Sequence, residues 1–423
     1  MLARLLLILS ACLIAAPAAA ETVVIHTGRL ITDASKPPLG PSTITVVDGR
    51  ISSIAEGHAP APAGAELVDL SAKTVLPGLV DTHVHLTGDP GGDWRDEAVD
   101  SSEWSTLVGA KNALLTAKAG FTTVRDLGAY PQSIFALRRA TDEGVIPGPR
   151  IVAAGSSISI IGGHGDVTGF RPDVMETLEI GNTCTGAVEC AERVREASRA
   201  GADVIKIPAT GGVLSQQARG LGQHFTDAEM KAIVDTAHSL GLKVAAHAHG
   251  ARGIEAAARA GVDSIEHGTF ADADAIAAMK ANGTALVPTL MAYTGIRDGL
   301  AKGVFTPAVA EKVRMTLDQV GKAAIAARAA GVPVVFGTDS AVYPHGRNAE
   351  EFAQLVEIVG MSPAEALASA TTGAAKLIDL ENEVGRIAPG YSADMIAVSG
   401  NPLENIRALE QVDWVMVRGE PIE

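Results

Sequence analysis

The 423-residue sequence predicts an α/β protein: a (β/α)8 TIM barrel with a small β-sandwich domain formed from both chain ends. Between about residues 76 and 380, short apolar runs alternate with Ala-rich segments of helical periodicity, which is typical of βα units. Short strand-like runs lie on both sides of this region. A doubly wound sheet would need a Gly-rich phosphate-binding loop after its first strand, and none follows His85. We therefore expect a barrel.

The flanks, residues 21–75 and 381–423, are expected to form the β-sandwich domain together. Turns such as Asp48-Gly49-Arg50 separate their strand-like runs, and no low-complexity linker divides them from the middle of the chain. The strands expected here are Thr22–His26, Ile44–Val47, Ile51–Ile54, Gly385–Ile387, Ala393–Val398 and Trp414–Val417.

Eight strands are expected in the barrel domain, residues 76–380. The first is the apolar run that ends at Asp81-Thr82-His83-Val84-His85, and the others are Thr122–Leu127, Ile151–Ala154, Val204–Ile207, Lys243–Ala246, Ser264–Glu266, Leu286–Leu290 and Val332–Gly337. The helix expected over Thr226–Leu240 begins with a capping box, because Thr226 precedes Glu229 by three residues. The segments Ser215–Gln223 and Tyr293–Phe305 are expected to be βα loops that set substrate specificity.

Residues 1–20 are expected to be a signal peptide. Arg4 precedes the apolar run Leu5–Leu9, and Ala18-Ala19-Ala20 offers a small-residue cleavage site. The segment is too short for a stable membrane span, so we expect a secreted or periplasmic protein. Leu9-Ser10-Ala11-Cys12 resembles a bacterial lipoprotein cleavage box, but position 12 is early for such a box, so lipid anchoring is the less favoured alternative.

The other two cysteines and the overall charge limit the remaining classes of protein. Cys184 and Cys190 are close enough in the chain to form a local disulfide in an oxidising compartment. No second cysteine pair is present to complete a metal site with them. The net charge of -15 argues against nucleic-acid binding, because no basic stripe could neutralise phosphates.

Side chains suited to metal binding follow the ends of several predicted strands, where a barrel of this type builds its active site. His83 and His85 are two residues apart, so they project from one face of a strand. Such a pair alone is often structural, and Asp339 alone could simply cap the following helix. Further histidines, however, lie at or just beyond other strand ends: His164, His247, His249, His267 and His345. A scatter of core histidines would not align in this way.

Lys206 is the most informative residue, because it lies inside the apolar strand Val204–Ile207. A buried ammonium is costly there, and burial lowers its pKa. A neutral lysine amine can react with carbon dioxide to give a carbamate, whose oxygens can bridge two metals. The alternative is a lysine that reaches solvent from a strand end or pairs with an acid. The metal-ligand candidates at the same rim favour the carbamate.

The order His-x-His, Lys, His, His, Asp on strands one, four, five, six and eight resembles the amidohydrolase superfamily, and so does the motif Pro77–His85. Several other motifs resemble its secreted, prolidase-like branch: Gly162-Gly163-His164, Val204–Ile207 with Ala209-Thr210-Gly211-Gly212, Ala246–Gly250, Ile265-Glu266-His267 and Tyr343-Pro344-His345-Gly346. That branch contains metal-dependent carboxypeptidases acting on Xaa-Pro or Xaa-Arg/Lys dipeptides, and amidases that hydrolyse ochratoxin A. The resemblance covers nearly the whole chain after residue 20.

The resemblance implies a site with two divalent metals, usually zinc, that hydrolyses an amide bond next to a C-terminal amino acid. The implied ligands of one metal are His83, His85 and Asp339, those of the other are His247 and His267, and carboxylated Lys206 bridges them. Asp339 would carry the proton to the leaving nitrogen, and His164 would donate a hydrogen bond to the oxyanion. Strand parity does not separate His247 from His249. We expect His249, Tyr293 and His345 to contact the substrate or support the ligands.

Two other functions stay open. One is a cyclic-amide hydrolase of the imidazolonepropionase type, against which Lys206 counts, because those enzymes resemble one-metal sites. The other is a non-enzymatic periplasmic metal-binding protein, which would explain the histidines but not an acid–base group at Asp339. The resemblance also implies a homo-oligomer, possibly an octamer, and a small-molecule or dipeptide substrate.

Overall fold

The computed structural model describes residues 21–90, 95, 98–216 and 220–423. The expected signal peptide and Cys12 lie outside the described residues. In the described part of the chain, no helix is long and apolar enough to cross a membrane.

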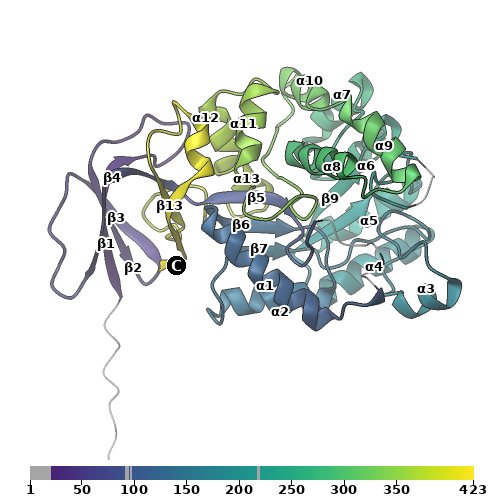
Figure 1. The fold of residues 1–423 in the computed structure, drawn as a ribbon, viewed down its shortest axis with the longest axis horizontal. Helices are drawn as coiled ribbons and strands as arrows, with labels where there is room; N and C mark the ends of the chain where they lie inside the picture. Colours follow the sequence, from purple (N-terminus) through teal and green to yellow (C-terminus); the bar gives the residue numbers. More distant parts are fainter. Residues whose placement is uncertain (1–20, 91–94, 96–97, 217–219) are drawn as a thin grey trace, which may run out of the picture.

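Strands from both chain ends form one sheet at one end of the molecule (Figure 1). Its order is β14-β13-β12-β4-β1-β2-β3. The strands are β1 Thr22–Leu30, β2 Ser42–Val47, β3 Arg50–Glu56, β4 Glu66–Pro77, β12 Met395–Val398, β13 Val412–Val417 and β14 Glu420–Pro421. Ile25 and Ile44 share a buried core with Met395 and Met416, so both ends of the chain fill it. This confirms the additional β domain, although hydrogen bonds join its strands into one sheet rather than two separate ones. Gly385–Ile387, expected as a strand, is not one, and the division at residues 75/76 stays a prediction because β4 runs through it.

Two parallel sheets form the middle of the chain. One has the order β5-β6-β7 and the other β11-β10-β9-β8. The strands are β5 Leu79–Val84, β6 Phe121–Asp126, β7 Arg150–Ala153, β8 Val204–Pro208, β9 Lys243–Ala248, β10 Ser264–His267 and β11 Ala285–Val287. The amide of Asp203 donates to the carbonyl of Ala153 at 2.9 Å, which joins the β7 and β8 sides.

The other opening between the sheets is filled by residues 332–340, where the eighth strand was expected. The segment makes one parallel bridge from Val334 to Leu286 of β11 and another from Ser340 to Val84 of β5. On its other side, the amide of Asp339 donates to the carbonyl of His83 at 2.8 Å. The segment is not a regular strand, and Pro333 within it has no N–H to donate. These contacts complete the arrangement of a (β/α)8 barrel with an irregular eighth member.

Helices surround the two sheets (Figure 1). They are α1 Ser102–Lys118, α2 Pro131–Asp142, α3 Pro172–Leu178, α4 Ala187–Ala200, α5 Asp227–Ser239, α6 Ala251–Ala260, α7 Ala273–Asn282, α8 Leu290–Lys302, α9 Pro307–Leu317, α10 Lys322–Ala330, α11 Glu350–Glu357, α12 Pro363–Ser369 and α13 Thr372–Leu377. The capping box of Thr226 and Glu229 is present at the start of α5. The expectation of a loop over Tyr293–Phe305 was wrong, because most of that segment belongs to α8.

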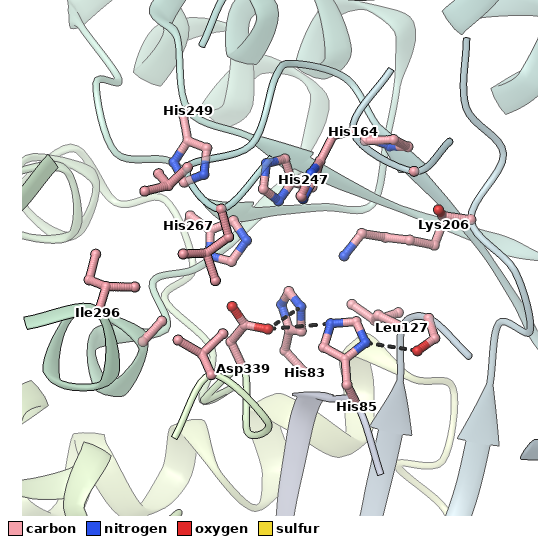
Figure 2. Close-up of a pocket in the computed structure, with 18 of the residues that line it drawn as sticks. His83, His85, Leu127, His164, Lys206, His247, His249, His267, Ile296 and Asp339 are labelled. Atoms are coloured by element: carbon pink, nitrogen blue, oxygen red, sulfur yellow. Dashed lines mark hydrogen bonds and ion pairs between the residues drawn. The ribbon is translucent and has the colours of Figure 1, made fainter. Parts of the chain in front are cut away.

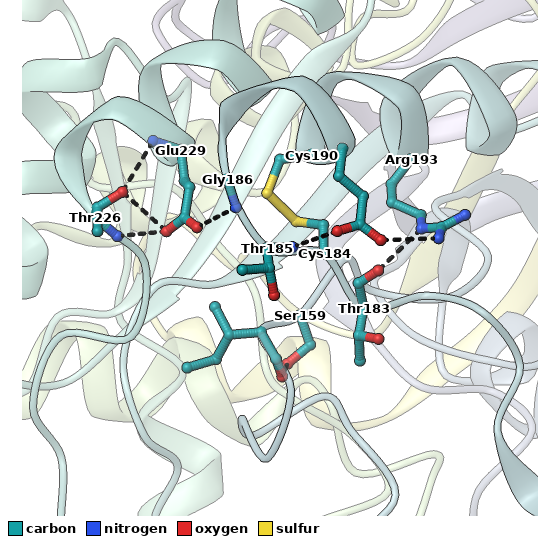
Figure 3. Close-up of a disulfide and its surroundings, with 11 residues drawn as sticks. Ser159, Thr183, Cys184, Thr185, Gly186, Cys190, Arg193, Thr226 and Glu229 are labelled. Carbon is teal, nitrogen blue, oxygen red and sulfur yellow. Dashed lines mark hydrogen bonds and ion pairs between the residues drawn. A yellow bond between two sulfur atoms is a disulfide. The ribbon is translucent and has the colours of Figure 1, made fainter. Parts of the chain in front are cut away.

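A disulfide joins Cys184 to Cys190 in the first turn of α4, a bond that the sequence allowed but did not decide (Figure 3). Beside it, the carboxylate of Glu229 on α5 accepts a hydrogen bond from the amide of Gly186 at 2.7 Å. The segment before α4 is therefore fixed to both helices. A disulfide is compatible with an extracellular protein.

Candidate metal centre and active site

A cavity of about 410 Å³ lies at the carboxyl ends of the parallel strands. Strand alternation decides which side chains reach it. On β8, Lys206 and Pro208 line the cavity, whereas Ile205 and Ile207 belong to the apolar core. The same alternation on β9 sends His247 and His249 into the cavity. The structure thus brings together all the metal-ligand candidates expected from the sequence: His83, His85, Lys206, His247, His267 and Asp339.

His83, His85 and Asp339 form one group that could hold a metal ion, because their ligand atoms lie within 4.8 Å of one another. Oδ1 of Asp339 is 3.4 Å from Nε2 of His83 and 3.3 Å from Nε2 of His85 (Figure 2). Asp81 ties the two chain segments of this group together. Its carboxylate accepts hydrogen bonds from the amide of His83 and from the amide and hydroxyl of Thr338.

A second group consists of His247, His249 and His267, whose ligand atoms also lie within 4.8 Å of one another. Burial lowers the pKa of His249 to about 3 and holds those of His247 and His267 well below the usual range. The three rings are therefore neutral, as metal binding requires. Lys206 extends toward the space between this group and the first one (Figure 2).

Backbone strain turns two of these side chains into the cavity. By strand alternation, His267 would follow Ile265 away from the cavity, but it has a φ of 70° and lines the cavity instead. Asp339 has a φ of 61°. Such left-handed conformations cost about 1–3 kcal/mol each for residues other than glycine, and they concentrate at functional sites.

Hydrogen bonds from the surrounding protein orient the rings. Nδ1 of His83 donates to Glu266 at 2.9 Å, and Nδ1 of His85 donates to the carbonyl of Gly128 at 2.9 Å. Nδ1 of His267 pairs with the Thr289 hydroxyl at 2.7 Å. Nε2 of each ring is thereby left for another partner, an arrangement typical of metal-bound histidines. Nε2 of His247 is buried and has no hydrogen-bond partner among the described residues. The donor set therefore fits bound metals.

Glu266 and Arg125 support the centre, and the sequence analysis assigned no role to either. Nη2 of Arg125 lies 3.0 Å from Oε1 of Glu266, and both side chains are buried. Burial alone would raise the pKa of Glu266, but the charge of Arg125 and the hydrogen bond of His83 hold it below its usual range. Glu266 thus stays ionised behind His83. Arg125 lies inside the strand-like run 121–127, and a charge expected to be buried there could have indicated its supporting role from the sequence.

Lys206 is only 5% exposed, and its side chain makes no hydrogen bond or ion pair with another described residue. Burial lowers its pKa to about 8. A larger fraction of the amine is therefore neutral near neutral pH than for an ordinary lysine. This is the form that can react with carbon dioxide.

His164 lies beside the second group, with its ring centroid 4.4 Å from that of His247. Its Nδ1 pairs with the Ser215 hydroxyl at 2.6 Å. Burial lowers the pKa of His164 to about 3, so the ring is neutral. Gly212 leaves the space that this ring occupies, because a Cβ atom at Gly212 would lie 2.3 Å from Nδ1 of His164.

The two other substrate candidates differ in position. Tyr293 lines the cavity, and its hydroxyl is 2.9 Å from that of Thr269, which also pairs with Nδ1 of His249 at 2.7 Å. Burial raises the pKa of Tyr293 to about 12, so its hydroxyl keeps its proton. His345 is not among the described residues that line the cavity, so its expected contact with the substrate stays a prediction. Its Nε2 donates instead to the carbonyl of Gly88 at 2.9 Å, which fixes the loop after β5.

The helix that carries Tyr293 is held by a buried acid from elsewhere in the chain. Thr289 precedes α8 but makes no capping bond with its side chain, which pairs with His267 instead. Glu351 of α11 replaces that cap: its carboxylate oxygens accept from the amides of Leu290 at 2.9 Å and Met291 at 2.7 Å. Glu351 therefore allows Thr289 to orient His267.

Comparison with known proteins adds independent evidence. Residues 74–422 match the model of the amidohydrolase family. The structure of a Xaa-Pro dipeptidase with bound methionine in its active site has 38% sequence identity and a TM-score of 0.90, and the match covers 95% of this chain and 99% of that one. The ochratoxinase of Aspergillus niger is 30% identical over 417 residues, which cover 93% of this chain and 84% of the relative. The imidazolonepropionase of Paracoccus denitrificans is 29% identical over 384 residues, which cover 83% and 86%.

The fold, the two groups of ligand-type side chains and the family match agree, and the non-enzymatic alternative is set aside. The chain belongs to the amidohydrolase family and is a hydrolase that acts on carbon–nitrogen bonds.

Proposed function

We propose that the protein is a two-metal amidase or dipeptidase that cleaves an amide bond next to a C-terminal amino acid. The observation that most directly supports this function is the position of Lys206, whose amine extends between two separate groups of ligand-type side chains (Figure 2). A one-metal site would not need a buried lysine there. The similarity to a Xaa-Pro dipeptidase and an ochratoxinase supports the same class of substrate.

In this proposal, His83, His85 and Asp339 would hold one metal, His247 and His267 would hold the other, and a carbamate on Lys206 would supply oxygen ligands to both. When bound, such a pair, most simply zinc, lowers the pKa of water and polarises the scissile carbonyl. His249 is placed to replace or assist His247, because the two are in one group.

The residues around the reacting atoms then have defined tasks. Asp339 accepts the proton of the attacking water and delivers it to the leaving nitrogen. In this proposal the ring proton of neutral His164 is on Nε2, and Nδ1 accepts the hydrogen bond that joins it to the Ser215 hydroxyl. That N–H stabilises the oxyanion that develops on the carbonyl oxygen. Tyr293 and His249, which both pair with the Thr269 hydroxyl, contact the substrate.

Metal analysis with a substrate panel tests the proposal. Purified protein should contain about two metals per chain, and Lys206→Ala should lose most of the metal together with activity on dipeptides and N-acyl amino acids. Lys231→Ala is the matched control, because Lys231 is exposed on α5 and pairs only locally with Asp235 among the described residues. A Lys206→Ala variant with full metal content and activity would refute the carbamate.

A second candidate is hydrolysis of a cyclic amide, which the similarity to imidazolonepropionase supports. Turnover of cyclic amides but of no open-chain member of the panel would favour it. About one metal per chain would agree with that result.

We further infer that the chain is exported after removal of residues 1–20 and acts as a homo-oligomer. The disulfide supports export, because such bonds persist in oxidising compartments. N-terminal sequencing of the mature protein tests cleavage after Ala20, and light scattering tests the oligomeric state.

A further inference from the structure

The cavity lining includes five apolar residues, here called the apolar wall: Val213 and Leu214 after β8, Ala292 and Ile296 on α8, and Val342 after the eighth segment. Thr316 of α9 also lines the cavity. Ile296 lies across the metal-ligand groups from Lys206 (Figure 2). A substrate bound at the reacting centre would therefore place one side chain against this wall.

The wall is held firmly by close backbone contacts. A Cβ atom at Gly295 of α8 would lie 2.5 Å from the carbonyl oxygen of Val342. The helix and the Val342 loop thus approach as closely as only glycine permits. Val213 and Ile296 are already 7% and 6% exposed without a ligand. A charged side chain entering here would meet a preformed apolar surface that cannot easily open to water.

A buried cation lies directly behind this wall. The ammonium of Lys312 on α9 donates to the carbonyl of Gly212 at 2.9 Å and to that of Ser215 at 2.7 Å. Val213 and Leu214 are the two residues between these carbonyls.

Negative charge, in contrast, is confined to the metal-ligand side. Among the described residues that line the cavity, Asp339 is the only one with a carboxylate. It lies 3.4 Å from His83 and 3.3 Å from His85. No carboxylate in the described lining therefore faces a cationic substrate side chain at the apolar wall.

We propose that this wall selects substrates with an uncharged, apolar side chain and excludes lysine and arginine. This inference rests on the proposed amide hydrolysis. Apolar contact with Ile296 and Val213 favours the first class. Desolvation of an ammonium or guanidinium acts against the second, and the like charge of Lys312 offers it no compensation. Within the prolidase-like range of substrates, the protein is thus assigned to side chains such as those of proline, leucine, methionine and phenylalanine.

Pairs of dipeptides that differ only by norleucine or lysine test the selection, since these residues share a four-carbon chain and differ by the terminal ammonium. The pair is made at the N-terminal and at the C-terminal position, and kcat/KM is measured for each. At the position that faces the wall, norleucine should exceed lysine by roughly 100-fold. Comparable kcat/KM values at both positions would overturn the inference. Failure to hydrolyse any open-chain amide would instead contradict the proposed function.

Variants at Ile296 test whether the apolar wall is the part of the cavity that distinguishes norleucine from lysine. Ile296→Glu supplies a carboxylate and should reduce the preference for norleucine at least about tenfold, whereas the matched control Ile296→Leu should preserve it. Ile296→Ala, which adds no charge, should lower kcat/KM for norleucine about tenfold and leave the lysine substrate nearly unchanged. An unaltered preference in folded Ile296→Glu and Ile296→Ala would overturn the assignment to this wall.

Discussion

Gly212→Ala tests whether the position of His164 is essential to the reaction. The added Cβ atom would lie 2.3 Å from Cε1 and Nδ1 of His164 and 2.5 Å from Nε2. Ordinary contacts between such atoms are about 3.5–4.0 Å. The ring must therefore move by roughly 1 Å or more, and it then loses its 2.6 Å hydrogen bond to Ser215.

The expected effects on stability and on catalysis differ in size. Loss of one hydrogen bond costs about 1 kcal/mol of unfolding free energy, which leaves the protein folded. Misplacement of a reacting group by 1 Å can cost roughly 100-fold in rate. We thus expect a kcat reduced about 100-fold in a variant with near-normal denaturant unfolding and metal content.

The control and the double variant make this prediction strict. Gly222→Ala is the matched control, because a Cβ atom at Gly222 meets nothing within 4 Å, and it should keep full activity. In a His164→Ala background, Gly212→Ala should cost almost nothing more, since the ring that it displaces is gone. Full activity of Gly212→Ala alone, or additive losses in the double variant, would refute the role given to His164.

Three further predictions concern the supports of the site. Glu351→Gln should destabilise the fold by about 1–3 kcal/mol, because the amide nitrogen of glutamine cannot accept the second N–H group of α8 as a carboxyl oxygen does, and denaturant unfolding measures the loss. Burial raises the pKa of Glu351 from 4.5 to about 8, so the folded state binds this proton more tightly than the unfolded state; stability should therefore fall as the pH rises from about 4.5 to about 8, with a smaller fall in Glu351→Gln. His247→Ala should lose about one metal per chain and His249→Ala less, and elemental analysis with the reverse order would exchange their roles. Replacing Cys184 and Cys190 by serine should cost about 2 kcal/mol, because the crosslink closes a short loop with a sequence separation of 6, and an unchanged Tm would contradict this.

The site was predictable where the side chains follow strand parity. His83, His85 and Lys206 required only the alternation of a strand and the cost of burying polar groups in apolar runs. His267 and Asp339 were expected at the correct strand ends, but their orientation depends on left-handed backbone at 70° and 61°, which no periodicity reveals. The sequence therefore predicted their presence better than their geometry.

Other features depend on long-range packing that sequence patterns do not express. The segment Tyr293–Phe305 was expected to be a loop, yet Gly295 and Gly299 within it let α8 pack against Val342 and Phe305. Glu351 pairs with α8 across 60 residues of chain. His345 follows Asp339 by only six residues in the sequence. In the structure it donates a hydrogen bond to Gly88 and is not among the described residues that line the cavity.

The junction between β5 and the eighth segment has a consequence for biosynthesis. His83 is made early, but Asp339 reaches it only when the last barrel unit docks, and the neighbouring bond from Thr82 to Phe336 spans 254 residues. A nascent or truncated chain that lacks the last unit consequently has no complete first metal group. The first metal group can therefore form only after the last barrel unit has docked. The protein cannot hydrolyse a substrate before its chain has folded.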